Sequence, residues 1–397
     1  MADVTLDEFR SRINSFFDEV LPSALDGVQG RVARAKTWRA ALYDAGLAGI
    51  DYPVECGGLG LGAQFKAAYT ELSAGRVPTE EGAYGIGIGM ALPTVRDHGS
   101  EALKQRFLKP GLRGEEIWCQ LYSEPGAGSD LASLSTRAVL DGDEWVISGQ
   151  KVWTSGAMDA DVAILLARTD PDQPKHRGIS MLVIDMRQEG VTVRPLKQMT
   201  GHAEFNEVFI DEARVPRDWV VGDVNDGWRM GTALLAHERV QTGVSSTLSD
   251  PNSRSKTGRV PIRIQTLMEL ARQQGRSQDP TVRQELARLY TGEQIIGYLR
   301  QRGTHPSIGK LWRSIQGLAA ADTAARLQFA GGVAWSDGDV DPDWYAFQIL
   351  NCRGMRLGGG TDEIQKNTLG EKALGLPREP AVDKDVPFRE LRTGTQR

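Results

Sequence analysis

The sequence is poor in cysteine and histidine and has no long apolar run. Its three cysteines, Cys56, Cys119 and Cys352, are too far apart for a structural zinc site or a small disulfide framework. Its five histidines are scattered and form no metal-binding motif. No stretch reads as a membrane span, and the acidic amino terminus lacks the basic start of a signal peptide. These absences indicate a cytoplasmic protein with reduced thiols, no metal and no membrane partner.

Acidic residues outnumber basic ones. The 397 residues include 47 lysines and arginines against 52 aspartates and glutamates, which gives a formal net charge of -5. This balance argues against nucleic acid as the main partner, because nucleic acid binding needs a basic surface. A chain of this length, 40% hydrophobic and 25% charged, is long enough for two or three domains with cores of their own.

The spacing of apolar residues divides the chain into three parts. Helical spacing over residues 1–114 predicts an all-helical amino-terminal domain. Alternation of apolar and polar residues over 115–222, with an Asp-Gly turn, predicts an antiparallel β domain. Helical spacing returns over 223–397 and predicts a four-helix bundle with a carboxy-terminal tail. The predicted fold class is therefore α+β with several domains.

One segment departs from the helical pattern of the last part. Residues 243–261, GVSSTLSDPNSRSKTGRVP, are rich in Ser, Gly and Pro where a helix would otherwise continue. We expect an inserted loop here. It is either a solvated surface excursion or a lid or interface element at the mouth of a substrate site.

Two blocks that suit ligand binding lie close together in the β part, CQLYSEPGAGSDLAS from Cys119 and QKVWTSG from Gln150. In the first block, a Glu-Pro turn precedes Gly128, which lets backbone N–H groups approach a ligand closely. In the second, Trp153 and Ser155 lie on the same face of a strand and can contact one planar ring. The alternatives are a polar turn between strands and a tryptophan that belongs to the core.

Two further elements, QFAGG and GTDEIQ, lie near the carboxy end. Gln328 opens the first, and Gly331 and Gly332 allow close approach of a ligand. Thr361 supplies an N-cap hydroxyl with Glu363 two residues on, at a helix start that favours anionic ligands. Alternatively, Thr361 and Glu363 only cap their own helix.

These four elements resemble the signatures of the acyl-CoA dehydrogenase family, and the resemblance extends along nearly the whole chain. It implies a helical, β, helical architecture with FAD between the β domain and the bundle. It also implies an oxidoreductase that converts an acyl-CoA thioester to the trans-2-enoyl-CoA and passes electrons to an electron-transferring flavoprotein. Family members usually form tetramers, so we expect a homotetramer, as a dimer of dimers, or a heterotetramer with a related subunit. The tail resembles extensions of bacterial members, some of which act on bulky ring-bearing thioesters, so fatty acid or steroid thioester catabolism is implied.

The resemblance also implies roles for individual residues around the cofactor. Ser123 would bond the pyrimidine end of the flavin, and Ser155 would lie near its N5. Arg276 stands where the family has an arginine that meets the pyrophosphate of a neighbouring subunit's FAD, but Asp279 and Pro280 replace the usual Phe-Gly, so a solvated arginine remains the alternative. The expected cofactor-binding residues are Tyr122, Ser123, Gly128, Ser129, Trp153, Ser155, Arg276, Gln328, Gly331, Gly332, Thr361 and Glu363.

The family's reaction requires a carboxylate that removes the α proton while the β hydrogen leaves as hydride to the flavin. Many members place a glutamate directly before the Gly-Thr of the last element, where this chain has Gly359. Glu238, directly before Arg239, resembles the base of the isovaleryl and long-chain members. Burial would raise its pKa towards working pH. Gly359 would leave room for it, and its N–H could stabilise the enolate-like oxygen. Ser129 and Arg239 are the expected substrate-binding residues.

Other interpretations of these residues remain open. Glu238 is alternatively an exposed helical glutamate paired with an arginine. The chain is alternatively a non-catalytic or half-site subunit of a heteromeric acyl-CoA dehydrogenase, since the usual base is missing. A flavin monooxygenase or oxidase on the same fold would need no α-proton base.

Overall fold

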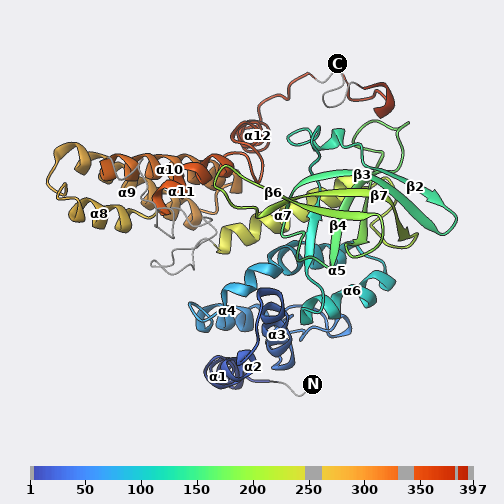
Figure 1. Cartoon of the computed structure of the whole chain (residues 1–397), viewed down its shortest axis with the longest axis horizontal. Coiled ribbons are helices and arrows are strands. Elements are labelled where there is room, and N and C mark those ends of the chain that lie inside the picture. Colours follow the sequence, from blue (N-terminus) through green and yellow to red (C-terminus); the bar gives the residue numbers. More distant parts are fainter. Residues whose placement is uncertain (1–3, 246–261, 330–343, 381–382, 392–397) are drawn as a thin grey trace. The chain divides into compact units, whose positions relative to one another are not determined.

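The computed structural model describes residues 4–245, 262–329, 344–380 and 383–391. The chain divides into two compact units. Unit 1 contains the amino-terminal helices and the sheet, and unit 2 contains the carboxy-terminal helices (Figure 1). The segments of unit 1 are Met1–Lys197, Ala203–Thr242 and Ala381–Arg397, and those of unit 2 are Gln198–His202 and Gly243–Pro380.

The amino-terminal part of unit 1 is helical, as predicted. Its first helix begins with a capping box, in which the Thr5 hydroxyl accepts from the Glu8 N–H and the Glu8 carboxylate accepts from the Thr5 N–H. Phe9, Ile13 and Trp38 form part of a buried core. The α-helices are α1 (Leu6–Ser15), α2 (Leu21–Leu25), α3 (Arg31–Asp44), α4 (Ala63–Leu72), α5 (Leu92–His98) and α6 (Glu101–Arg113).

The sheet of unit 1 has the strand order β6-β7-β3-β2-β4-β5-β8, with β1 also paired to β4. Most pairs are antiparallel, and the hairpin predicted at the Asp-Gly turn is confirmed between β2 and β3. The strands are β1 (Trp118–Leu121), β2 (Arg137–Asp141), β3 (Glu144–Ser155), β4 (Val162–Arg168), β5 (Ile179–Asp185), β6 (Val191–Leu196), β7 (Phe205–Pro216) and β8 (Val220–Val221).

The sheet differs from the prediction in one respect, because β1 and β2 both run parallel to β4. β1 pairs with the start of β4, and Arg137 of β2 pairs with Arg168 at its end. β1 and β2 therefore follow one another along the same edge of β4. Of the residues between them, 122–136, those from 122 to 134 are called the signature loop below. This loop leaves the sheet between the end of β1 and the start of β2, where β4 has neither strand beside it on that edge.

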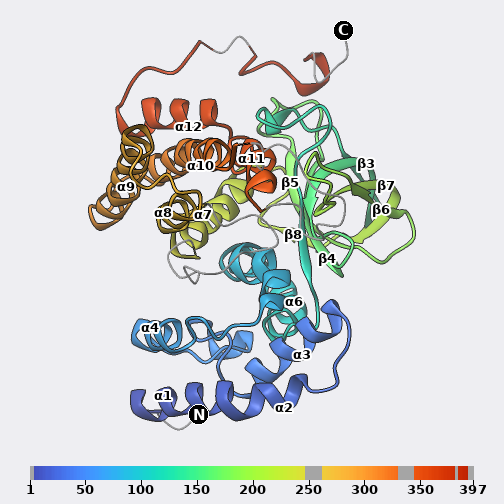
Figure 2. The ribbon, with the colours of Figure 1, turned by 60° about the vertical axis from the view of Figure 1, so that its left-hand side comes forward.

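A shared core joins the amino-terminal helices to the sheet. Phe107 of α6 packs edge-on against Trp118 of β1 at 5.3 Å between ring centroids, and against Trp219 at 4.9 Å. Helix α7 (Gly227–Ser245) adds Met230 and Leu234 to the same core. Helix α6 accordingly lies beside the sheet, while α1 and α2 lie farther from it (Figure 2).

Unit 2 is helical and has a core of its own. Helix α10 packs against α8, α9, α11 and α12. Leu267, Leu289, Ala324 and Cys352 are among the residues of its core. The helices are α8 (Ile264–Gln273), α9 (Pro280–Gln301), α10 (Pro306–Gln328), α11 (Trp344–Met355) and α12 (Asp362–Thr368). The predicted order of helical, β and helical parts is thus confirmed.

Among the described helices, none has the length and apolarity that a membrane crossing requires.

The junction of helices and sheet gives a first prediction. Phe107→Ala should lower the free energy of unfolding by about 3–5 kcal/mol, because it leaves a cavity between Trp118 and Trp219. Urea denaturation followed by tryptophan fluorescence measures this change. Val139→Ala, at a side chain of β2 that is 49% exposed, is the control and should change stability by less than about 0.5 kcal/mol. Equal effects of the two substitutions would contradict the packing described.

Candidate functional site

The two blocks singled out in the sequence lie side by side in unit 1. The N–H of Val152 donates to the carbonyl of Ser123 at 2.9 Å, which joins β3 to the signature loop. The predicted turn at Glu124 is present, because Glu124 and Ala127 exchange two backbone hydrogen bonds of 3.0 Å. Ser123 therefore lies directly beside the strand that carries Trp153.

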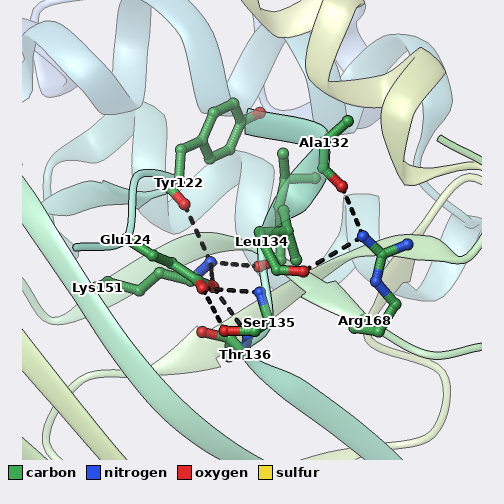
Figure 3. A network of polar contacts seen from close by, with 9 residues as sticks. Tyr122, Glu124, Ala132, Leu134, Ser135, Thr136, Lys151 and Arg168 are labelled. Atoms are coloured by element: carbon green, nitrogen blue, oxygen red, sulfur yellow. Dashed lines mark hydrogen bonds and ion pairs between the residues drawn. The ribbon is translucent and has the colours of Figure 1, made fainter. Parts of the chain in front are cut away.

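A buried ion pair fixes this arrangement (Figure 3). Lys151 of β3 is fully buried, and its Nζ donates to the Glu124 carboxylate at 2.8 Å. The same Nζ donates to the carbonyl oxygens of Tyr122 at 3.0 Å and Leu166 at 2.8 Å. An ammonium has three N–H donors, so every one of them has an acceptor. The signature loop, β3 and β4 meet at this single charge.

The Glu124 carboxylate is equally well satisfied. It accepts from the N–H of Ser135 at 2.7 Å, the hydroxyl of Ser135 at 2.9 Å and the N–H of Thr136 at 2.9 Å. Burial works against its charge, but Lys151 and these hydrogen bonds lower the pKa of Glu124 to about 2. Complete burial lowers the pKa of Lys151 from its ordinary value, and Glu124 opposes that shift. The sequence predicted only a turn at Glu124 and no role for Lys151. The signal that could have identified the ion pair is an acidic residue in the first block and a basic residue in the second.

Trp153 lies in a β-bulge. Lys151 pairs with Val208 and Thr154 pairs with Asn206, so two residues of β3 face one residue of β7. Trp153 has a φ of 61°, in the left-handed region that bulky residues rarely adopt. The bulge leaves its side chain 58% exposed.

The residues after Trp153 complete an aromatic and hydroxyl-bearing edge. Phe205 packs edge-on against the Trp153 ring at 5.8 Å. Thr154 is buried, and its hydroxyl has no hydrogen-bond partner among the described residues. Ser155 is half-buried. The bulge interrupts the regular alternation of strand side chains at Trp153, so the common face of Trp153 and Ser155 stays a prediction.

Gly128 and Ser129 of the signature loop are exposed. A Cβ at Gly128 would meet no other atom within 4 Å, so the described chain itself does not require glycine there. The space beside this backbone is what close approach of a ligand needs. Ser129 is exposed next to it. The structure thus brings Tyr122, Ser123, Gly128, Ser129, Trp153 and Ser155 to one part of unit 1.

The GTDEIQ element of unit 2 begins helix α12. The Thr361 hydroxyl accepts from the N–H of Ile364 at 3.2 Å, so it caps the helix. Glu363 is exposed. Gly359 has a φ of 65°, and its carbonyl accepts from the Gln365 amide at 2.8 Å. The left-handed backbone disfavours any residue with a Cβ at position 359, which explains why glycine suits this position.

Arg276 of unit 2 has partners within its own unit. Its guanidinium donates to the Asp279 carboxylate at 2.8 Å and to the Arg326 carbonyl at 3.1 Å, and it lies 4.5 Å from the centre of the Phe329 ring. Asp279 also accepts from the N–H of Thr281 and so caps α9. The aspartate that departs from the family pattern therefore gives Arg276 an internal counter-ion. Gln328, at the end of α10, is half-buried.

Several predicted residues cannot be placed in full. Glu238 and Arg239 lie on α7, and their side chains are outside the described residues. Position 238 comes one helical turn after Leu234, whose side chain is buried in the core of unit 1. Gly331 and Gly332 are outside the described residues. Of the expected insertion, residues 243–245 extend α7 and 246–261 are outside the described residues.

Comparison with known proteins establishes the family. The model of the acyl-CoA dehydrogenase N-terminal domain matches residues 5–115, and that of the middle domain matches 119–213. The acyl-CoA dehydrogenase IpdE1 of Mycobacterium tuberculosis is 37% identical over 402 residues, which cover 96% of this chain and 99% of that protein. The chain belongs to the acyl-CoA dehydrogenase family, as the motifs predicted, and its class is that of flavin-dependent oxidoreductases.

Solved structures agree with the fold. A structure described as the Tcur3481-Tcur3483 steroid ACAD matches with a TM-score of 0.72 and 28% identity, covering 94% of this chain and 98% of that chain. The ChsE4-ChsE5 complex from Mycobacterium tuberculosis matches with a TM-score of 0.66 and 26% identity, covering 96% of this chain and 100% of that chain. These likenesses confirm the predicted fold class.

The buried ion pair gives a mutational prediction. Lys151→Met should destabilise the fold by about 3–5 kcal/mol, because it leaves the Glu124 carboxylate buried without its counter-charge. The double variant Lys151→Met, Glu124→Gln should be less destabilised than the single one, since no unpaired charge remains. Urea denaturation of the wild type, both single variants and the double variant measures the difference. A double variant that is as unstable as the sum of both single variants would show that the two groups do not interact.

The pKa of Glu124 gives a prediction about acid. Its folded value of about 2 lies below the ordinary value of 4.5, so the carboxylate stabilises the fold fully above about pH 5. This contribution, about 3 kcal/mol, should be lost as the pH falls towards 2. The measurement is the difference in unfolding free energy between wild type and Glu124→Gln at successive pH values. The difference should shrink below about pH 5, and a constant difference would refute the assignment.

Proposed function

We propose that this chain catalyses the FAD-dependent α,β-dehydrogenation of an acyl-CoA thioester to the trans-2-enoyl-CoA in the cytoplasm. The observation that carries this proposal is the joining of the signature loop to the bulged strand at Lys151. This joining ties a loop with an open glycine backbone to the strand that carries an exposed tryptophan, in a member of the acyl-CoA dehydrogenase family. The open backbone and the tryptophan suit a planar cofactor next to a thioester arm.

The residues of unit 1 fit a flavin in three ways. Trp153 offers an exposed aromatic surface, Gly128 leaves space beside its backbone, and the buried Thr154 hydroxyl lacks a partner among the described residues. Tyr122, Ser123, Gly128, Ser129, Trp153 and Ser155 would hold the flavin from unit 1, and Arg276, Gln328, Gly331, Gly332, Thr361 and Glu363 are the candidates from unit 2. When bound, FAD would accept the β hydrogen together with its electron pair.

Glu238 is the proposed general base. Its carboxylate would take the α proton, and the electrons of that C–H bond would form the new double bond as the β hydrogen leaves as hydride. Position 238 follows Leu234, a core residue of unit 1, by one turn of α7. A base enclosed beside the flavin and an acyl chain would have a raised carboxylate pKa. Gly359 has no side chain that could take the proton. Its N–H is proposed to bind the thioester oxygen, and Ser129 and Arg239 are proposed to bind the substrate.

The partners follow from the same proposal. Electrons would pass to an electron-transferring flavoprotein, and the assembly would be a homotetramer or a heterotetramer with a related subunit. The relative named a steroid ACAD supports a bulky, ring-bearing acyl group as the substrate class. A fatty acyl thioester is the alternative substrate to be tested.

A second candidate is a half-site subunit of a heteromeric complex. It is favoured by Arg276, which donates to Asp279 and to the Arg326 carbonyl, so the arginine expected at a neighbouring FAD already has internal partners. The two structural relatives are also described as two-component proteins. Expression of the chain alone separates the two proposals. A yellow protein favours the homomer, and a colourless one that gains flavin only with a related subunit favours the half-site.

The base assignment gives a direct prediction. Glu238→Gln should abolish bleaching of the flavin band on anaerobic addition of acyl-CoA, because the α proton has no acceptor. Bound FAD should stay unchanged, as the absorption spectrum shows. Glu269→Gln, at an exposed position of α8, is the matched control and should retain the wild-type rate.

Two outcomes would redirect the proposal. Full activity of Glu238→Gln would place the base elsewhere. Steady peroxide formation in air, without a stable reduced flavin after acyl-CoA addition, would favour an oxidase or monooxygenase on the same fold.

A further inference from the structure

The carboxy-terminal residues 383–391, called the tail segment, lie against the β4–β5 loop of residues 169–178. The N–H of Phe388 donates to the Gln173 carbonyl at 2.9 Å, and the N–H of Arg389 donates to the Pro171 carbonyl at 3.0 Å. Pro387 and Pro174 form an isolated bridge next to these contacts. Both segments belong to unit 1. The tail segment is therefore docked through its backbone along the loop.

Lys175 of the β4–β5 loop connects the tail segment to the signature loop. Its Nζ lies 2.8 Å from the carboxylate of Asp383 and 3.1 Å from that of Asp130. The Lys175 side chain is 13% exposed, against 35% for Asp383 and 58% for Asp130, so solvent screens the pair with Asp383 less than the pair with Asp130. Burial works against its charge, but the two carboxylates raise the pKa of Lys175 above its ordinary value. Asp130 directly follows Ser129, the proposed substrate-binding residue.

Arg168 provides a second connection (Figure 3). Its buried guanidinium donates to the carbonyls of Ala132 at 2.6 Å and Leu134 at 3.2 Å, both in the signature loop. It also donates to the carbonyl of Lys175 at 2.7 Å. The ring of Phe388 covers this guanidinium, with 3.8 Å from its carbon to the ring centre. The tail segment thus contacts Lys175 and Arg168, two of the cations that hold the signature loop.

The restraint matters because the middle of the signature loop has little packing of its own. Gly128, Ser129 and Asp130 are all exposed, so burial does not fix their conformation. An exposed loop without such ties samples many conformations, and fixing it at the moment of binding would cost affinity. Ties to Lys175 and Arg168 on its carboxy-terminal side reduce that cost.

We propose that the tail segment is a clamp that positions the signature loop for the acyl-CoA thioester. Asp383 and Phe388 are its positioning residues, acting through Lys175 and Arg168 on the backbone around Ser129. The nature of the ligand rests on the proposed function, while the restraint of the loop does not. The clamp lowers the concentration of thioester that the enzyme needs and leaves the proton and hydride transfers to other residues.

The test uses the full chain with the substitutions Asp383→Asn and Phe388→Ala, singly and together. Asp385→Asn is the matched control, since it removes the same charge two residues further along the chain. The Asp385 side chain is exposed and makes no hydrogen bond or ion pair with the described residues. Hydrogen exchange of the signature-loop amides and steady-state kinetics with acyl-CoA are measured for each protein, together with flavin content.

The double variant should exchange signature-loop amides at least about threefold faster than wild type. Its KM for acyl-CoA should rise about tenfold, and that of each single variant about two- to fivefold, with kcat within about twofold. Flavin content should be unchanged, and Asp385→Asn should match wild type in every measurement. A structural role without positioning would not produce a rise in KM alone.

Three results would overturn the clamp. Unchanged loop exchange in the double variant would show that the tail segment does not restrain the loop. Faster exchange with an unchanged KM would show that the restraint does not serve substrate binding. Loss of bound flavin, or a lower kcat together with a higher KM, would indicate a general loss of structure. If wild type itself fails to react with any acyl-CoA, the proposed function fails, and the exchange data still decide whether the tail segment restrains the loop.

Discussion

The buried pair of Lys151 and Glu124 is the interaction on which the candidate site depends. Removing two charges from water costs several kcal/mol for each ion, so the pair is tolerated only because its geometry and its hydrogen bonds are nearly complete. Lys151 uses three donors, and Glu124 accepts from Ser135 and Thr136 as well. Such a pair contributes little net stability compared with apolar packing, but it accepts only one arrangement of the segments that meet there.

That single arrangement sets the neighbouring residues. Ser123 directly precedes Glu124, and the bulge that exposes Trp153 begins immediately after Lys151. A small shift of either charge would break several hydrogen bonds at once, so the loop and the strand keep their relative register. The left-handed conformation of Trp153 costs on the order of 1–3 kcal/mol. The buried ion pair next to it keeps the backbone from relaxing out of this conformation.

Sequence patterns predicted the order of helical and β parts well, because the apolar period changes sharply near residues 115 and 222. They did not predict the bulge at Trp153, since a period-two pattern carries no mark of one extra residue in a strand. They also missed Lys151, because a lysine in a strand normally faces solvent. Asp279 departs from the family pattern in the sequence, but its pairing with Arg276 depends on a turn that only the structure shows. Glu238 and Gly359 were predicted by resemblance alone. For Gly359 the structure adds a physical reason, because its left-handed backbone favours glycine.

The docking of residues 383–391 also bears on how the chain matures during synthesis. Lys175 and Asp383 are more than two hundred positions apart, and all of unit 2 is translated between them. The sheet can therefore close and bury its core long before its last partner leaves the ribosome. Until then the ammonium of Lys175 has only Asp130 beside it, and Arg168 lacks its aromatic cover. The surroundings of the signature loop are thus completed only after unit 2 has been synthesised.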